Sequence, residues 1–262
     1  PIYHMWSADY FGQTYAIQTT QTYYQKLPPR KMLKHMTMMD MEQRHDEHHV
    51  SYRSNNAELL SLNLTVISCR PRVFEIRNFL STVEVNHLLS IASKSKLEES
   101  TVSAGDTGDT YEKMKYNQAR SSSNTWIYRE ESPIVDTIYR RAAAVMNIDE
   151  KYMRDRLFDY NTDDPVKSSR AEALQLVHYD VGQHYTPHHD FTFPSSLNSY
   201  QPTRFVTLLL YLNDEGLEGG ETAFPKGVNA ESPSGLMVTP EMGKAVLFYN
   251  MLPDGNMDDL FQ

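Results

Sequence analysis

The sequence predicts an α+β protein in which a jelly-roll-like pair of sheets is backed by helices. Two stretches with helical spacing of apolar residues follow residue 73. After residue 163 the chain becomes a series of short β-rich segments separated by glycine and proline turns. Helices followed by many short strands are typical of this arrangement. A length of 262 residues and a hydrophobic content of 40% allow one large domain with an extension.

Residues 1–70 differ in character from the rest and are expected to form an irregular N-terminal extension, with the domain proper at residues 71–262. The extension carries aromatic residues and methionines without clear periodicity, and the Pro28-Pro29 pair interrupts any regular element there. Residues 31–50 combine methionines with histidines, a composition compatible with a soft-metal tract. An irregular or helical segment with a solvated polar end is the favoured interpretation.

One strand and two helices are expected in the first half of the domain. Residues 72–76 alternate as in a short strand. Ser81, with Glu84 three residues later, forms a capping box that opens a helix, and Pro133 suits the first position of a second helix. The apolar faces of these helices comprise Val85, Leu88, Leu89 and Ile91 in the first, and Ile134, Val135, Ile138, Ala142 and Val145 in the second. The polar residues 97–117 between them are expected to form a mobile loop.

The second half of the domain is predicted to be β-rich. Its apolar segments are short, enriched in β-preferring residues and bounded by turn residues. Strands are expected at residues 173–179, 183–190, 204–212, 235–239 and 244–249, with turns at 180–182 and 218–222, the latter leading into Ala223-Phe224.

Composition excludes several classes of protein. The formal net charge of −9 argues against a nucleic-acid binder, which normally carries a basic face. The single cysteine, Cys69, excludes an intramolecular disulfide and a thiolate cluster. The sequon Asn63-Leu64-Thr65 is weak evidence for a secretory route. No apolar run approaches the roughly 18 residues of a membrane span. The chain begins at Pro1, so a signal or anchor upstream is compatible with it.

His188 and Asp190 form the candidate metal-binding pair. If residues 183–190 are extended, side chains two apart project to the same face. An imidazole nitrogen and a carboxylate oxygen would then meet at one point, a donor set that suits a divalent ion such as Fe(II). A hydrogen-bonded surface pair is the alternative. A helical zinc pair of His184 and His188 is disfavoured, because Pro187 would lie inside the helix.

Four separated motifs in this chain resemble the prolyl 4-hydroxylase catalytic domain of the Fe(II)/2-oxoglutarate dioxygenases. They are Tyr179 to Asp190, Arg204 to Thr207, Gly219 to Thr222 and Gly243 to Phe248. The similarity runs from about Val73 to the end of the chain and does not cover residues 1–70. It implies a double-stranded β-helix core buttressed by the N-terminal helices. It also implies Fe(II), 2-oxoglutarate as cosubstrate, O2, ascorbate as the usual reductant, and a proline-containing peptide or protein as substrate.

The resemblance also implies roles for individual residues. His188 and Asp190 match the first two iron ligands, Tyr179 a tyrosine that hydrogen-bonds the 2-oxoglutarate carboxylate, and Thr222 a threonine near its far end. The positions that match the peptide groove are Arg120, Ser122, Glu172, Tyr185 and Arg204. Taken singly, three of these residues have ordinary structural interpretations: Tyr179 as an inward strand tyrosine, Arg204 as a surface cation at a strand start, and Thr222 as a turn residue.

The family pattern also requires a second histidine shortly after the strand that ends near Phe248, and a lysine about ten residues further on. No histidine follows His189 in the sequence. We therefore expect a chain cut at both ends, lacking the C-terminal strands of the barrel, and catalytically inactive as it stands. The competing interpretation is a noncatalytic peptide-binding module of the same fold. A cupin-like protein is disfavoured by the ligand spacing. An endoplasmic-reticulum location follows only from the resemblance, and the need for a partner subunit stays open.

Overall fold

The computed structural model describes residues 4–21, 58–100, 120–153, 169–191, 203–227 and 233–260. The methionine- and histidine-rich residues 31–50 and most of the loop expected at 97–117 lie outside these ranges. Within them, helices are few and each pair of neighbouring strands is antiparallel. No helix in this described part is both long and apolar enough to span a membrane.

Five strands form the main sheet, in the order β1-β2-β3-β10-β7. Their bounds are Thr14–Gln21 (β1), Glu58–Ser68 (β2), Val73–Ile76 (β3), Ala245–Tyr249 (β10) and Val206–Leu210 (β7). β10 lies between β3 and β7 and is completely buried. This sheet therefore joins the beginning of the described chain to its end.

The N-terminal 70 residues are not irregular where they are described. β1 and β2 pair over eight residues, from Thr14 opposite Thr65 to Gln21 opposite Glu58. β2 then pairs with β3, which ties both strands to the main sheet. Leu62, Leu64 and Val66 are buried and alternate with more exposed residues, as expected for a strand with one face on the core. The expectation of an irregular extension is wrong for these two segments.

The two predicted helices are present with their predicted caps. α2 (Thr82–Lys94) begins after Ser81, whose hydroxyl accepts from the Glu84 backbone N–H while the Glu84 carboxylate accepts from the Ser81 N–H. α3 (Pro133–Met146) begins after Ser132, with Pro133 at its start. Short 3-10 helices at Arg129–Glu131 and Glu150–Met153 flank α3.

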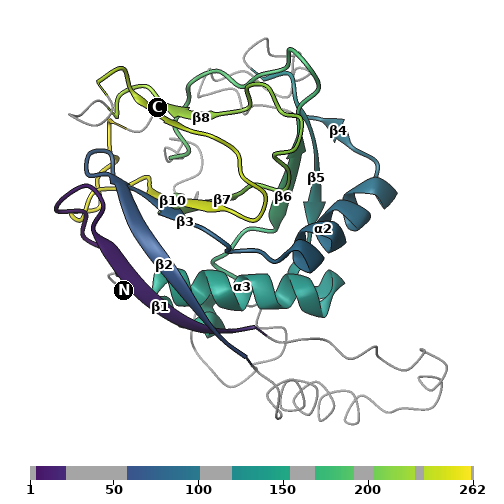
Figure 1. Ribbon diagram of the computed structural model, residues 1–262, viewed down its shortest axis with the longest axis horizontal. Helices are drawn as coiled ribbons and strands as arrows, with labels where there is room; N and C mark the ends of the chain where they lie inside the picture. Colours follow the sequence, from purple (N-terminus) through teal and green to yellow (C-terminus); the bar gives the residue numbers. More distant parts are fainter. Residues whose placement is uncertain are drawn as a thin grey trace, which may run out of the picture.

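The main sheet has a different core on each of its faces. On one face, Ala245, Leu247 and Tyr249 of β10 join a large cluster that includes buried side chains of α2, α3, β1 and β2. On the other face, Val246 and Phe248 join a smaller cluster with the two-stranded sheet of β8 (Thr222–Phe224) and β9 (Leu236–Val238). Figure 1 shows the same layering, with α3 beneath the sheet and β8 on the opposite side. Alternate residues of the central strands therefore face two different compartments.

A third sheet lies beside these layers, in the order β4-β5-β6, with bounds Glu98–Glu99, Ser123–Ile127 and Leu174–His178. The strand expected at 183–190 is absent. This segment follows the turn at Val181-Gly182 and makes one isolated bridge, between Tyr185 and Arg120. The other predicted strands of the second half are present, with slightly shorter bounds.

Candidate metal centre

His188 and Asp190 lie together on the loop that follows β6. The Nε2 atom of His188 is 3.3 Å from Oδ1 of Asp190, and the two side chains are 38% and 20% exposed. The predicted convergence is therefore present, although the backbone that produces it is a loop rather than the expected strand.

The hydrogen bond of His188 to the backbone determines which of its two ring nitrogens carries the proton. Nδ1 lies 2.9 Å from the carbonyl oxygen of Thr186, and a carbonyl only accepts, so Nδ1 carries the proton. In the neutral ring Nε2 is then an acceptor that points at a carboxylate oxygen, itself an acceptor. A cation between the two atoms, either a proton on Nε2 or a metal ion, makes this 3.3 Å contact favourable. A histidine that donates its other N–H to a backbone carbonyl is the usual arrangement in metal sites.

Asp190 is held from its other side by the main sheet. The Thr207 hydroxyl of β7 donates to Oδ2 of Asp190 at 2.8 Å, and the Asn250 side-chain amide donates to the Thr207 oxygen at 3.0 Å. Burial by itself raises the pKa of Asp190. The hydrogen bond and charge that His188 supplies when its ring is protonated, with the hydrogen bond from Thr207 and the charge of Arg204, outweigh burial and hold that pKa below its ordinary value. Asp190 is therefore a carboxylate at neutral pH.

Tyr185 and Arg120 stack beside the pair. The rings of Tyr185 and His188 are parallel within 17°, with centroids 3.6 Å apart. On the Tyr185 ring lies the guanidinium of Arg120, 4.7 Å from the centroid. Arg120 also donates through Nε to the buried hydroxyl of Ser122 at 3.1 Å. The structure thus brings three of the residues predicted for the peptide groove into one group with His188.

Glu172 and Arg204 form a two-point ion pair. Nε and Nη2 of Arg204 donate to the two carboxylate oxygens of Glu172 at 2.7 and 3.0 Å. Burial raises the pKa of both Tyr185 and Asp190, and the nearby charge of Arg204 acts in the opposite direction on both, so the ion pair lies near the stack. Tyr179 is 44% exposed and directly follows β6, on the segment that leads to Tyr185 and His188.

Thr222 is on the opposing layer. It begins β8, two residues before Phe224, so both side chains face the main sheet. Its hydroxyl oxygen accepts a hydrogen bond from the Tyr211 phenol at 2.7 Å, and burial raises the pKa of Tyr211. The described contacts do not join Thr222 to His188 or Asp190.

Sequence reasoning missed two residues of this centre, Thr207 and Asn250. Each of them is a polar residue in or beside an apolar strand, and this was the available signal. Thr207 ends one of the four motifs named above, and Asn250 directly follows the apolar strand β10. Among the described residues no group of three or more His, Cys, Asp or Glu side chains is arranged to hold a metal ion. His188 and Asp190 offer one imidazole nitrogen and one carboxylate oxygen, donor types that suit a divalent ion.

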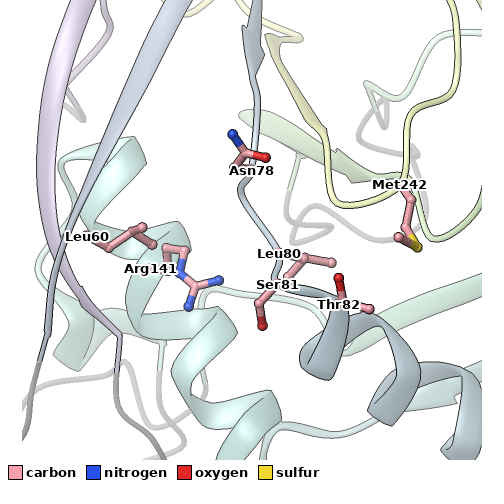
Figure 2. A pocket seen from close by; sticks show the side chains of 7 residues that line it. All are labelled: Leu60, Asn78, Leu80, Ser81, Thr82, Arg141 and Met242. Atoms are coloured by element: carbon pink, nitrogen blue, oxygen red, sulfur yellow. The ribbon is translucent and has the colours of Figure 1, made fainter.

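A pocket of about 440 Å³ lies elsewhere, where the chain enters α2. Figure 2 shows the Arg141 side chain extending from α3 toward Ser81 within it. Arg141 is buried and donates to both carboxylate oxygens of Glu84 at 2.8 and 2.7 Å, and also to the Phe79 carbonyl. The pocket is lined by Leu60, Asn78, Leu80, Ser81, Thr82, Arg141 and Met242, none of which is a candidate site residue. We therefore assign its ion pair to stability.

Residues 174–254 match the family model of the 2OG-Fe(II) oxygenase superfamily. The chain is 35% identical over 205 residues to probable prolyl 4-hydroxylase 3 of Arabidopsis thaliana, covering 74% of this chain and 63% of that protein. It is 34% identical to prolyl 4-hydroxylase 5 of the same plant, covering 74% and 62%. The chain thus spans somewhat less than two thirds of the length of these relatives. The resemblance to the prolyl 4-hydroxylase catalytic domain is confirmed by these matches.

Solved structures give a weaker match. One is the 2OG complex of a viral collagen prolyl hydroxylase from Paramecium bursaria Chlorella virus-1, with a TM-score of 0.47 and 21% identity over 72% of this chain and 84% of that one. Another is a prolyl-4-hydroxylase of Pseudomonas putida, with a TM-score of 0.42 and 18% identity over 68% and 80%. The family resemblance rests on the sequence matches.

Proposed function

We propose that this chain carries the catalytic domain of a peptidyl-proline 4-hydroxylase that uses Fe(II), 2-oxoglutarate and O2, with ascorbate as reductant. Its fold would be a double-stranded β-helix, formed by the main sheet and the β8–β9 layer and buttressed by α2 and α3. The observation that carries the proposal is the His188–Asp190 pair, with its acceptor atoms 3.3 Å apart, inside the stretch that matches the oxygenase superfamily.

Each candidate residue then has a role within this chain. His188 and Asp190 would hold the iron, which supplies the oxidising chemistry when bound. Tyr179 and Thr222 would bind the carboxylates of 2-oxoglutarate. The position of Thr222 on the inner side of β8 supports a role facing the main sheet. Its hydrogen bond to Tyr211 would orient its hydroxyl.

The substrate would be a proline-containing peptide or protein. Arg120, Ser122 and Tyr185 form one connected group against His188, and Glu172 with Arg204 forms a charged pair near it. We assign to these five residues the orientation of the peptide over the metal. The exposed Arg204 and Glu172 offer donors and acceptors to a peptide, while the buried Ser122 would act by holding Arg120 on the Tyr185 ring.

The 262-residue chain itself is proposed to be inactive. The described residues offer two ligands, and no histidine follows His189 to act as the third. The same observation favours the second candidate function, a noncatalytic peptide-binding module. An endoplasmic-reticulum location stays a prediction from the resemblance.

Incubation with a proline-rich peptide, Fe(II), 2-oxoglutarate and ascorbate tests both functions. Succinate and peptidyl 4-hydroxyproline are measured by mass spectrometry, and peptide binding is measured in parallel by calorimetry. We expect this chain to bind the peptide without forming either product, and a chain extended to supply the distal histidine and lysine to form both. Succinate from this chain above the level of its His188→Ala variant would contradict the proposed inactivity. An extended chain without turnover would leave the binding module.

A further inference from the structure

The direction of the hydrogen bonds from Asn250 through Thr207 to Asp190 is fixed by chemistry. A carboxylate only accepts, so the Thr207 hydroxyl must donate its single proton to Oδ2 of Asp190. The oxygen of Thr207 can then only accept from the Asn250 amide, which sets the orientation of that amide with Nδ2 toward Thr207. In this orientation the Oδ1 atom of Asn250 points away from Thr207. That atom is buried and accepts no hydrogen bond from the described residues.

This chain of hydrogen bonds connects a loop residue to the main sheet. Thr207 lies on β7, an edge strand of the main sheet, opposite Phe248 of the buried strand β10. Asn250 follows β10, is 1% exposed, and its backbone N–H donates to the Phe205 carbonyl at 3.0 Å. Thr207 and Asn250 therefore have little freedom to move, whereas Asp190 is in a segment without strand pairing. A side chain on such a loop needs this kind of support to keep a defined geometry.

The two carboxylate oxygens of Asp190 are divided between different partners. Oδ2 accepts from Thr207 at 2.8 Å, and Oδ1 lies toward Nε2 of His188 at 3.3 Å. Because Oδ2 is engaged by the hydroxyl, only Oδ1 is directed at the point where the two ligands meet.

We propose that Thr207 and Asn250 are positioning residues that hold Asp190 so that Oδ1 alone binds the metal ion. Neither residue touches the metal; both act through Asp190. A supporting hydrogen bond of this kind changes metal affinity by about 10- to 100-fold. This inference rests on the proposed function, because it requires His188 and Asp190 to bind a divalent ion.

Binding of Mn(II), followed by the loss of its free electron paramagnetic resonance signal, tests the proposal without any turnover. We expect Thr207→Val to weaken Mn(II) binding about 10- to 100-fold, and Thr207→Ser, which keeps the hydroxyl, to bind as the original chain does. Asn250→Ala should weaken binding, and adding it to Thr207→Val should cause no further loss, because both act in series. Thr137→Val is the matched control, since this buried hydroxyl donates to Pro133 within α3.

The outcomes separate this inference from the proposed function. If His188→Ala weakens Mn(II) binding but Thr207→Val does not, the positioning role is wrong and the metal site stands. If Thr207→Ser is as weak as Thr207→Val, the hydroxyl is not responsible and the role is also wrong. If His188→Ala binds Mn(II) as the original chain does, the metal site and the positioning role fail together. Thermal unfolding without metal checks that each variant is folded.

Discussion

The Nε2 atom of His188 lies 3.3 Å from Oδ1 of Asp190, and the chain contains a second pair with the same spacing. In that pair, Nε2 of His178 is 3.1 Å from Oδ1 of Asp180, with side chains 53% and 73% exposed. His188 is further held by the Thr186 carbonyl and the Tyr185 ring, and Asp190 by Thr207. Surroundings, rather than spacing, distinguish the candidate site from the exposed pair.

The Tyr185 ring should hold the His188 ring in the plane required for coordination. Replacing Tyr185 by Leu removes the stack at 3.6 Å and its cation–π contact with Arg120. An aromatic pair contributes about 0.5–1.5 kcal/mol, so we expect a roughly 2- to 10-fold weaker Mn(II) affinity. Tyr185→Phe keeps the ring and should bind as before. Equal losses in both variants would show that the phenol hydroxyl, and not the stack, matters.

The pair of Arg204 and Glu172 should contribute to peptide binding more than to stability. Its side chains are 42% and 55% exposed, and ion pairs of this exposure contribute at most about 1 kcal/mol. We expect Arg204→Ala to lower the free energy of unfolding by less than about 1 kcal/mol while weakening peptide binding. Arg77→Ala, which removes the exposed pair with Glu75, is the control and should leave peptide binding unchanged. Peptide affinity that is equal in both variants would contradict the assigned role.

The buried pair of Glu84 and Arg141 should make stability depend on pH. Burial raises the pKa of Glu84. The hydrogen bonds and charge of Arg141, together with the hydrogen bonds of Ser81, outweigh burial and lower this pKa below its ordinary value of 4.5. A carboxyl whose pKa is lowered by folding stabilises the protein above its unfolded pKa, and this contribution is lost as the pH falls through the folded pKa.

Glu84→Gln should therefore lower the free energy of unfolding by about 3 kcal/mol near neutral pH, because Arg141 is left buried without a counter-charge. The difference between the original chain and the variant should shrink as the pH falls below 4.5. Urea unfolding at a series of pH values measures it. A difference that stays constant or grows on acidification would show that the charge of Glu84 is not what stabilises the pair.

Local signals in the sequence predicted the helices well. The capping box of Ser81 and Glu84, and Pro133 after Ser132, act within a few residues of the helix starts that they determine. β1 and β2 were missed, although Leu62, Leu64 and Val66 alternate with polar residues. Their stability depends on pairing with each other and with β3, which composition alone does not reveal.

The sequence predicted that His188 and Asp190 lie together, but it did not predict the residues that support them. His188 and Asp190 were found from their spacing and the family resemblance, but the expected strand geometry was wrong because the segment pairs only at Tyr185. Thr207 and Asn250 are 43 residues apart in the sequence and meet only because β7 and β10 are neighbours in the sheet. Contacts that depend on strand order cannot be read from one sequence without the topology.

The most direct test of the metal site compares the two pairs of equal spacing in one experiment. Mn(II) dissociation constants are measured for the original chain, His188→Ala and His178→Ala. Our account predicts a loss of affinity of about tenfold or more for His188→Ala, and no change for His178→Ala, whose side chain belongs to the exposed pair. Equal affinities in all three proteins, or equal losses in both variants, would contradict the assignment of His188 and Asp190 as metal ligands.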